Sequence, residues 1–169
     1  YGNYVHFNLT YTIALKYLPP GIAYRIARAD ADVDRNIETR SETPWGYKYH
    51  FPYPWQLEAA VDNAYSTLSP EELGKALHTI QDYFCHILQG YGPNYFSFGH
   101  IIETALNKLF PGRFEDPDDP FASFDDIERL SYTVEITEKI LEDYARRLSE
   151  FITYVMLYVI PLVAIAILK

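Results

Sequence analysis

The spacing of histidine and aspartate in the stretch GKALHTIQDYFCH, residues 74–86, is the clearest chemical signal in the sequence. His78, Asp82 and His86 stand at i, i+4 and i+8, so they share one face of an α-helix whose neighbouring positions are apolar. Three buried polar side chains would each need a separate partner, whereas one divalent cation satisfies imidazole and carboxylate groups together. The pattern therefore favours metal binding over three separately paired residues.

The length of this helix face indicates more than one ion. At a rise of 1.5 Å per residue, the eight steps from His78 to His86 span roughly 12 Å, which is too far for both to bind one ion. Asp82 lies between them and can bridge one ion to the next. The stretch therefore predicts a cluster of metal ions, with Asp82 linking neighbouring sites.

Further ligands must come from other segments, and each of the five histidines has a carboxylate or a buried face nearby. His100 and Glu103 stand at i, i+3 and could complete a site with His86. The spacing leaves open which aspartate of the segment ARADADVD takes part. The remaining candidates are His6, His50, Asp30 and Asp34.

The apolar periodicity predicts an all-α chain without strands. Ser69 is expected to cap the helix of the metal face, with Pro70 at its first position and Glu72 at the capping-box position. This helix is expected to run to Leu88. Residues 35–54, which are rich in Pro, Gly and aromatics, predict an irregular but ordered loop. The other expected helices cover residues 4–18, 21–34, 55–68, 100–109 and a long last segment from residue 125 or 126 into the apolar tail.

The bulk composition limits the classes of function. The 169 residues are enough for one helical domain with its own core, and we divide them into a metal-binding domain, residues 1–145, and a hydrophobic C-terminal helix, residues 146–169. The net charge of −9 argues against binding of duplex nucleic acid, since affinity for phosphate backbones comes mainly from Lys and Arg. The single cysteine, Cys85, excludes an intramolecular disulfide.

The segment Phe151–Leu168 contains 18 residues without a charge. This is the lower end of the roughly 17–25 residues that a membrane span needs, and Tyr154 and Tyr158 lie near its start, where interfacial aromatics are common. We expect a membrane anchor, with two alternatives: a helix buried in the core, or an assembly helix between subunits of a homo-oligomer. Tyr1 in place of Met is compatible with a processed N-terminus, so an extracellular or cell-surface location is expected.

In their order along the chain, these motifs resemble the zinc-dependent phospholipase C family and the related fungal-type single-strand nucleases, which share an all-helical trinuclear-zinc fold. YGNYVH is similar to the mature start of the nucleases, and ARADADVD followed by YHFPYP is similar to their Asp and His-Phe segments. The pair His78-x3-Asp82 matches the central His-x3-Asp of the family. The matches cover roughly residues 1–105.

The resemblance implies up to three Zn²⁺ ions. The first would bind Asp34 or Asp30 with His50, His78 and Asp82, the second Tyr1, His6 and Asp82, and the third His86, His100 and Glu103. The chain departs from the family pattern at the third ion. Here His86 follows Asp82 after four residues rather than six, and Glu103 follows His100 after three rather than four.

The activity implied by the resemblance is that of a metal-dependent phosphoester hydrolase, phospholipase C-like, in which a zinc-activated hydroxide attacks phosphorus. Asp30 or Asp34, whichever the metal leaves available, would assist as acid or base. The acidic charge, the apolar tail and the Tyr-rich loops favour a phospholipid substrate. Aromatic loops also stack bases, so a single-strand nuclease or nucleotidase is an alternative.

Two alternatives to the enzyme involve no catalysis. One is a structural or assembly protein, a component of a filament, a virion or a membrane surface, in which the metals stabilise the fold. The other is a plain helical bundle without metal. An open coordination position facing a solvent-accessible pocket would favour the enzyme.

Overall fold

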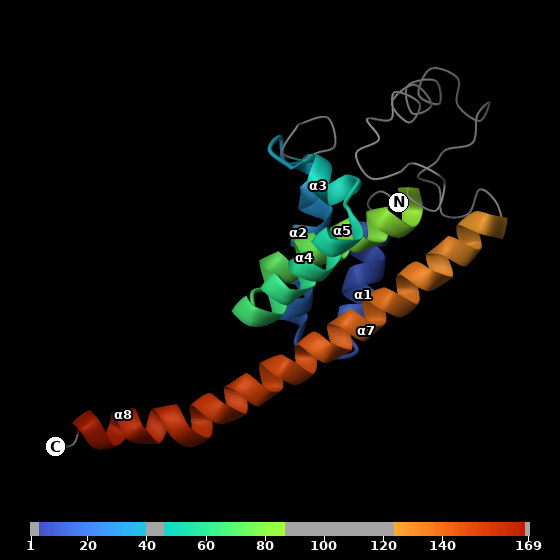
Figure 1. The fold of residues 1–169 in the computed structure, drawn as a ribbon. Helices are drawn as coiled ribbons and strands as arrows, with labels where there is room; N and C mark the ends of the chain where they lie inside the picture. Colours follow the sequence, from blue (N-terminus) through green and yellow to red (C-terminus); the bar gives the residue numbers. More distant parts are fainter. Residues whose placement is uncertain (1–3, 40–45, 87–123, 168–169) are drawn as a thin grey trace.

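The computed structural model describes residues 4–39, 46–86 and 124–167, and every regular element in these ranges is helical (Figure 1). This confirms the all-α prediction. Tyr1, His100, Glu103 and the helix predicted at 100–109 lie outside the described residues. In chain order the elements are a π-helical turn η1 (Tyr4–Leu9), α1 (Thr10–Ala14), α2 (Pro20–Arg35), α3 (Tyr47–His50), α4 (Pro54–Thr67), α5 (Pro70–His86), α7 (Phe124–Tyr154), a second π-helical turn η3 (Val155–Val159) and α8 (Ile160–Ile167).

Prolines start three of these helices, because a proline at the first position loses no helical hydrogen bond. The predicted cap of α5 is confirmed, since the Ser69 hydroxyl accepts a hydrogen bond from the Glu72 backbone N–H at 3.2 Å. The Glu72 carboxylate accepts hydrogen bonds from Asn63 and Lys75. The prediction of an irregular loop at residues 35–54 was wrong in one respect, because this segment contains the short helix α3.

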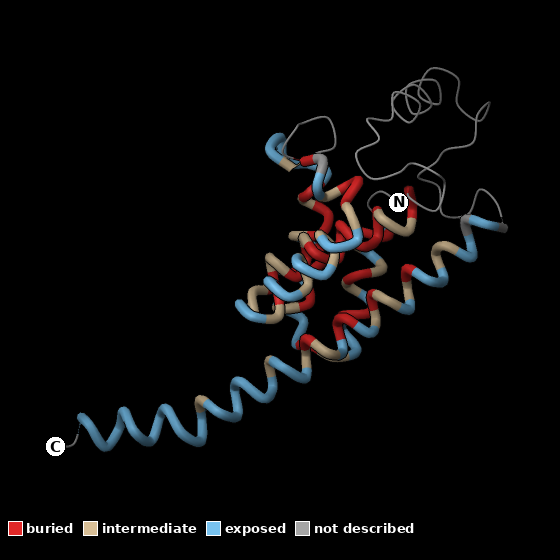
Figure 2. Tube along the Cα trace, in the orientation of Figure 1, coloured by how far each residue is buried: buried red, intermediate tan, exposed pale blue. Residues whose placement is uncertain are grey.

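The hydrophobic core lies between α1, α2, α4 and α5 and the middle of α7. Buried residues cluster there, whereas the far end of the long C-terminal helix is exposed (Figure 2). Aliphatic side chains fill the centre, with one tyrosine among them. The largest buried members of this core are Ile26, Leu73, Leu77, Leu141 and Tyr144.

Helices α2 and α5 run side by side in the same direction and approach very closely at Gly74. A Cβ at this position would lie 2.4 Å from the Ile26 carbonyl oxygen and 2.8 Å from the Asp30 backbone nitrogen. Only glycine allows such an approach of two backbones. One turn later, His78 on α5 faces Asp30 and Asp34 on α2. The close packing therefore brings polar positions of both helices together.

Helix α7 runs antiparallel to α5. Thr137 contacts Gln81 near the end of α5, and the Tyr144 hydroxyl donates to the Leu68 carbonyl just before its start. The helix continues past residue 146, the boundary drawn from the sequence, without interruption and leads through η3 into α8 (Figure 1).

The helical segment Ile127–Ile167 contains a stretch long and apolar enough to cross a membrane, and none of that stretch is buried against the described residues. The prediction of a candidate membrane helix is thus confirmed at the level of length and composition. The alternative of a helix buried in the chain's own core is wrong for the part of the chain that the structure describes. Exposed apolar patches of this size commonly mark contacts with lipid or with another molecule.

Candidate metal centre

Histidine and aspartate side chains from four helical elements meet between α2 and α5. All of them are buried except Asp34, whose side chain is 41% exposed. They include every candidate from the sequence that falls in the described ranges. Their positions are His6 on η1, Asp30 and Asp34 on α2, His50 on α3, and His78, Asp82 and His86 on α5.

Asp82 lies at the centre, and its two oxygens face different imidazoles. Oδ1 lies 3.2 Å from His6 Nε2, while Oδ2 lies 2.6 Å from His50 Nδ1. Oδ2 is also 3.4 Å from His78 Nε2. A carboxylate with one oxygen toward each of two nitrogen groups has the arrangement that can bridge two metal ions.

Two groups of ligand atoms are compact enough to surround a metal ion, with all atoms of a group within 4.8 Å of one another. One group is His6, His78 and Asp82, which are all buried. The other is Asp34, His50 and His78, in which Asp34 is exposed. Mixed imidazole and carboxylate ligands suit Zn²⁺. These buried groups can therefore hold a metal ion.

The structure separates the roles of the two aspartates that the sequence left open. Asp30 Oδ1 lies 3.0 Å from His6 Nδ1 and 3.4 Å from His78 Nδ1, behind the nitrogens that face Asp82. Asp34 lies on the Nε2 side, 3.6 Å from His78. A carboxylate behind a metal-binding imidazole orients the ring. The distances favour Asp34 as the ligand and Asp30 as the orienting group.

Asp30 Oδ1 and His78 Nδ1 are buried and lack a well-formed hydrogen bond, although Asp30 Oδ1 lies 3.0 Å from His6 Nδ1 and 3.4 Å from His78 Nδ1. Burying a polar atom without a partner costs free energy, and such atoms in a folded chain call for an explanation such as an ion. A cation bound at His78 Nε2 would favour the tautomer with hydrogen on Nδ1, next to Asp30. The residues therefore fit a metal.

The charges of the cluster shift its pKa values in opposite directions. Burial opposes ionisation of Asp82, but the nearby His78 and hydrogen bonds from His50 and His6 hold the pKa of Asp82 well below its usual range. Burial also works against protonation of His78, yet Asp82 and Asp30 raise the pKa of His78 to about 10. The pKa of Asp82 thus favours an ionised carboxylate, and a metal ion that bound His78 would have to compete with a proton.

The pKa of His6 is also raised. Burial and the neighbouring His78 both act to lower it, but hydrogen bonds to Asp30 and Asp82 outweigh them. The His6 ring stacks at a tilt on His78, with centroids 4.1 Å apart. Two imidazoles this close are most easily kept together by shared anionic partners or by a metal.

Further polar residues that the sequence analysis did not identify hold the ligands in place. Gln81 Oε1 accepts from His6 Nδ1 at 2.8 Å, and Gln81 Nε2 donates to Thr10 Oγ1 at 2.9 Å. Thr10 in turn donates to Asp30 Oδ2 at 2.7 Å. Their positions in the sequence could have indicated this role, since Thr10 lies one turn after His6 and Gln81 directly precedes Asp82.

The backbone carbonyl of Thr39 orients the His50 ring from the side opposite Asp82. Its Nε2 lies 3.1 Å from the Thr39 carbonyl oxygen, so this nitrogen can donate there while Nδ1 points to Asp82. Such a second contact fixes the tautomer of a metal-binding imidazole. The short helix α3, missed in the sequence, is what places His50 over α5.

His86 lies at the edge of the cluster. Its Nε2 is 3.7 Å from Asp82 Oδ2, and its ring packs against Phe51. The partners expected for it at a third ion, His100 and Glu103, lie outside the described residues, as does Tyr1. Within the described ranges, His86 belongs to neither of the two compact ligand groups.

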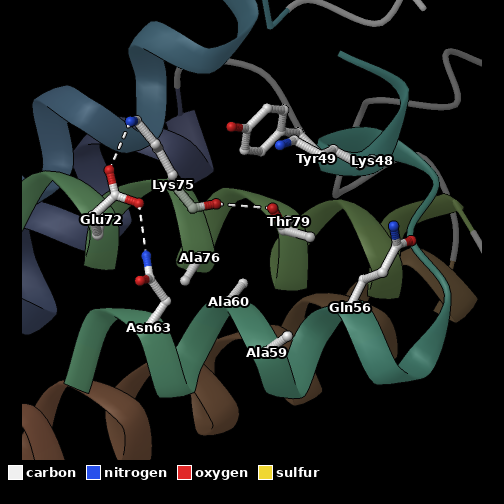
Figure 3. Close-up of a pocket in the computed structure, with 10 residues that line it drawn as sticks. All are labelled: Lys48, Tyr49, Gln56, Ala59, Ala60, Asn63, Glu72, Lys75, Ala76 and Thr79. Atoms are coloured by element: carbon white, nitrogen blue, oxygen red, sulfur yellow. Dashed lines mark hydrogen bonds and ion pairs between the residues drawn. The ribbon is translucent and has the colours of Figure 1, made fainter. Parts of the chain in front are cut away.

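A separate pocket lies on another face of α5, against α3 and α4 (Figure 3). Two of its charged residues, Glu72 and Lys75, pair with each other, and Glu72 also contacts Asn63. Its lining contains none of the clustered histidines or aspartates. The pocket is therefore distinct from the candidate metal centre.

Comparisons of the chain with family models, with characterised proteins and with solved structures found no match. The function of the cluster must therefore be inferred from these distances, burial and charges.

Proposed function

We propose that this protein is a zinc-dependent phosphoester hydrolase whose ions are bridged by Asp82. The observation that supports the proposal is the orientation of that carboxylate, with Oδ1 toward His6 and Oδ2 toward His50. Two ions a few ångströms apart, held by one carboxylate, are the arrangement that phosphoester hydrolases use to hold both the attacking and the leaving oxygen.

The contacts suggest how the ligands would divide. One ion would bind Asp34, His50, His78 and Asp82 Oδ2, and the other His6 and Asp82 Oδ1. The resemblance to zinc-dependent phospholipase C and single-strand nucleases adds Tyr1 to the second ion. It also adds a third ion at His86, His100 and Glu103.

Bound zinc would supply Lewis-acid catalysis and would lower the pKa of a coordinated water. The chain's own residues would do the rest. Asp82 sets the spacing of the ions, and Asp30 orients His6 from behind. Asp34 is the one exposed member of the described cluster, so it lies where water and substrate would enter.

The apolar helix is proposed as the anchor of this enzyme in a membrane. Residues 151–167 lack charge, and their length, about 26 Å at 1.5 Å per residue, is close to the ~30 Å of a hydrocarbon core. Most of these side chains are at least half exposed. Placement of the domain on the extracellular side stays a prediction from the sequence.

One observation favours the alternative of a structural protein. All members of the cluster except Asp34 are buried, and a closed metal site stabilises a fold rather than catalysing a reaction. In that case zinc would bind with the same residues but no phosphoester would be cleaved. The two functions therefore differ in turnover and not in metal content.

The test is metal analysis of the purified protein with a phosphodiester assay, on the native chain and on His78→Ala. We expect bound zinc and activity in the native protein, and loss of activity together with the ion that His78 binds in His78→Ala. Asp62→Asn, which changes an exposed carboxylate on α4, should retain both. Zinc without turnover would indicate the structural role, and absence of zinc would refute the proposal.

A further inference from the structure

We propose that the metal cluster acts on phosphoesters that reach it from water, and not on the lipids of the membrane that its own C-terminal helix enters. This rests on the proposed function and on the proposed anchor. It goes further by assigning the physical state of the substrate, and it replaces the preference for membrane phospholipid that the sequence suggested. The observation is the distance along α7 between the cluster and the apolar span.

Two contacts show beside which residue of α7 the cluster lies. Gln81 Nε2 donates to Thr137 Oγ1 at 3.4 Å, and Gln81 Oε1 lies 2.8 Å from His6 Nδ1. The His6 side of the cluster therefore lies beside Thr137. From Thr137 to Phe151, where the uncharged span begins, α7 is one continuous helix. These fourteen steps correspond to about 21 Å at 1.5 Å per residue.

The domain also has a membrane-near and a membrane-far end. Tyr144, which donates to the Leu68 carbonyl, lies only seven steps, or about 10 Å, before Phe151. The turn between α4 and α5 is thus nearest the span. From there α5 leads away toward His86, and the tail leaves the domain at the end opposite α3 (Figure 1).

The exposed side of the cluster faces the far end. Asp34, its one exposed member among the described residues, lies in the last turn of α2. Because α2 runs parallel to α5, this last turn is at the end away from the apolar span. Substrate entering beside Asp34 would therefore come from the water side.

The distance of about 21 Å along α7 from the cluster to the apolar span exceeds the thickness of the lipid headgroup layer. A bilayer of about 40–45 Å with a core of about 30 Å leaves about 5–8 Å for the headgroups on each side. A helix tilt of about 20° shortens the 21 Å only to about 20 Å. A phospholipid of the same bilayer would have to be lifted out of it to bring its phosphate to Asp82.

Among the described residues, the charges near the span form no cationic surface that would draw lipid headgroups upward. Arg146 pairs with Asp143 and Glu150, and Arg147 pairs with Asp143. These basic residues are therefore already neutralised within α7. The height and the charge pattern point to the same class of substrate, a water-soluble phosphoester.

The geometry is tested by energy transfer from a label on the domain to an acceptor on lipid headgroups, with the full chain in phosphatidylcholine vesicles. Cys85 is buried, so single cysteines introduced elsewhere will take the label. We expect efficient transfer from Glu150→Cys and weak transfer from Glu38→Cys, beyond the end of α2. Equal transfer from both positions would overturn the inference, as would a chain that does not associate with vesicles.

Substrate choice is tested on the same vesicles with zinc bound. The probes are bis(p-nitrophenyl) phosphate, water-soluble dihexanoyl phosphatidylcholine and the long-chain phosphatidylcholine of the host vesicle. We expect hydrolysis of at least one soluble probe at no less than about ten times the rate on the host lipid. Cleavage of the host lipid at the rate of the soluble lipid would overturn the inference.

Two results separate this inference from the proposed function. If no probe is cleaved although zinc is bound, the proposed hydrolase fails, and the inference fails with it, whatever the energy transfer shows. An insertion of seven helical residues between Glu150 and Phe151 raises the domain by about 10 Å. It should leave hydrolysis of the soluble probes unchanged, whereas a loss of activity on host lipid would show that the site works at the membrane surface.

Discussion

Gly74 on α5 lies against the backbone carbonyl of Ile26 on α2, and no residue with a Cβ fits between them. The contact sets the register of the two helices, because His78 and Asp30 follow it by one turn on α5 and α2. It connects a position without functional groups to the geometry of the metal centre. Helix packing and ligand geometry are thus coupled at one residue.

Gly74→Ala is expected to destabilise the fold and to weaken metal binding together. The added methyl group would lie 2.4 Å from a backbone oxygen that cannot rotate away, so α2 and α5 must separate. Overpacking of this kind typically costs about 1–3 kcal/mol. Urea denaturation with and without zinc measures both effects.

The matched control is Gly21→Ala at the start of α2, where an added Cβ meets nothing within 4 Å. This variant should be as stable as the native protein or more stable by up to about 1 kcal/mol, since alanine is the better helix former. If Gly74→Ala behaves like Gly21→Ala, the close approach does not determine the metal site.

Asp30→Asn and Asp34→Asn should differ in how they affect zinc. Asp30 lies behind the imidazoles and Asp34 beside their Nε2 atoms. We expect Asp30→Asn to lower zinc affinity about 10–100-fold without changing the number of ions, as loss of an outer-shell partner does. Asp34→Asn should weaken one ion far more than the other. Competition titrations with a chelator measure this, and loss of an ion in Asp30→Asn would make Asp30 the ligand.

Tyr144→Phe should change stability most clearly at high pH. Burial, opposed by Arg25, raises the pKa of Tyr144 from about 10 to about 12. Because the folded-state pKa is raised, this contribution is fully present below pH 10 and is lost as pH rises toward 12. The native protein should therefore lose stability over this range more steeply than Tyr144→Phe.

The same variant should cost about 1 kcal/mol at neutral pH, where it removes the hydrogen bond to the Leu68 carbonyl. Denaturation series from pH 8 to pH 11.5 give both quantities. Equal slopes for the two proteins above pH 10 would show that Tyr144 ionises as easily in the folded chain as in the unfolded one.

Leu157→Lys is expected to impair membrane association, whereas Ile37→Lys should not. The two side chains are similarly exposed, 62% and 66%, but only Leu157 lies in the uncharged helix. A lysine near the centre of a span costs roughly 2.5–3.5 kcal/mol. Flotation with lipid vesicles measures the effect. If Leu157→Lys still floats but no longer forms oligomers in detergent, the helix serves assembly instead.

The sequence predicted the helices and the ligand-bearing face of α5 because both depend on local spacing. His78 and Asp82 are four residues apart, and that spacing alone places them on one side of a helix. Ser69 and Pro70 marked the start of α5 in the same local way. These features needed no knowledge of what packs against the helix.

The remaining features depend on contacts between distant segments. Nothing local to Gly74 shows that it meets the Ile26 carbonyl, and nothing local to Gln81 shows that it joins His6 to Thr10. The separate roles of Asp30 and Asp34 also follow from which side of His78 each one faces. Such relationships are determined by tertiary packing.

The most direct test of the account is the number of zinc ions bound by the native chain and by Asp82→Ala, measured by metal analysis after removal of free zinc. The native protein should bind at least two ions, and Asp82→Ala should lose both, because both oxygens of this carboxylate are used. The exposed Asp62→Asn variant should bind the native number. A native protein without zinc, or an Asp82→Ala protein that binds as many ions as the native one, would contradict the account.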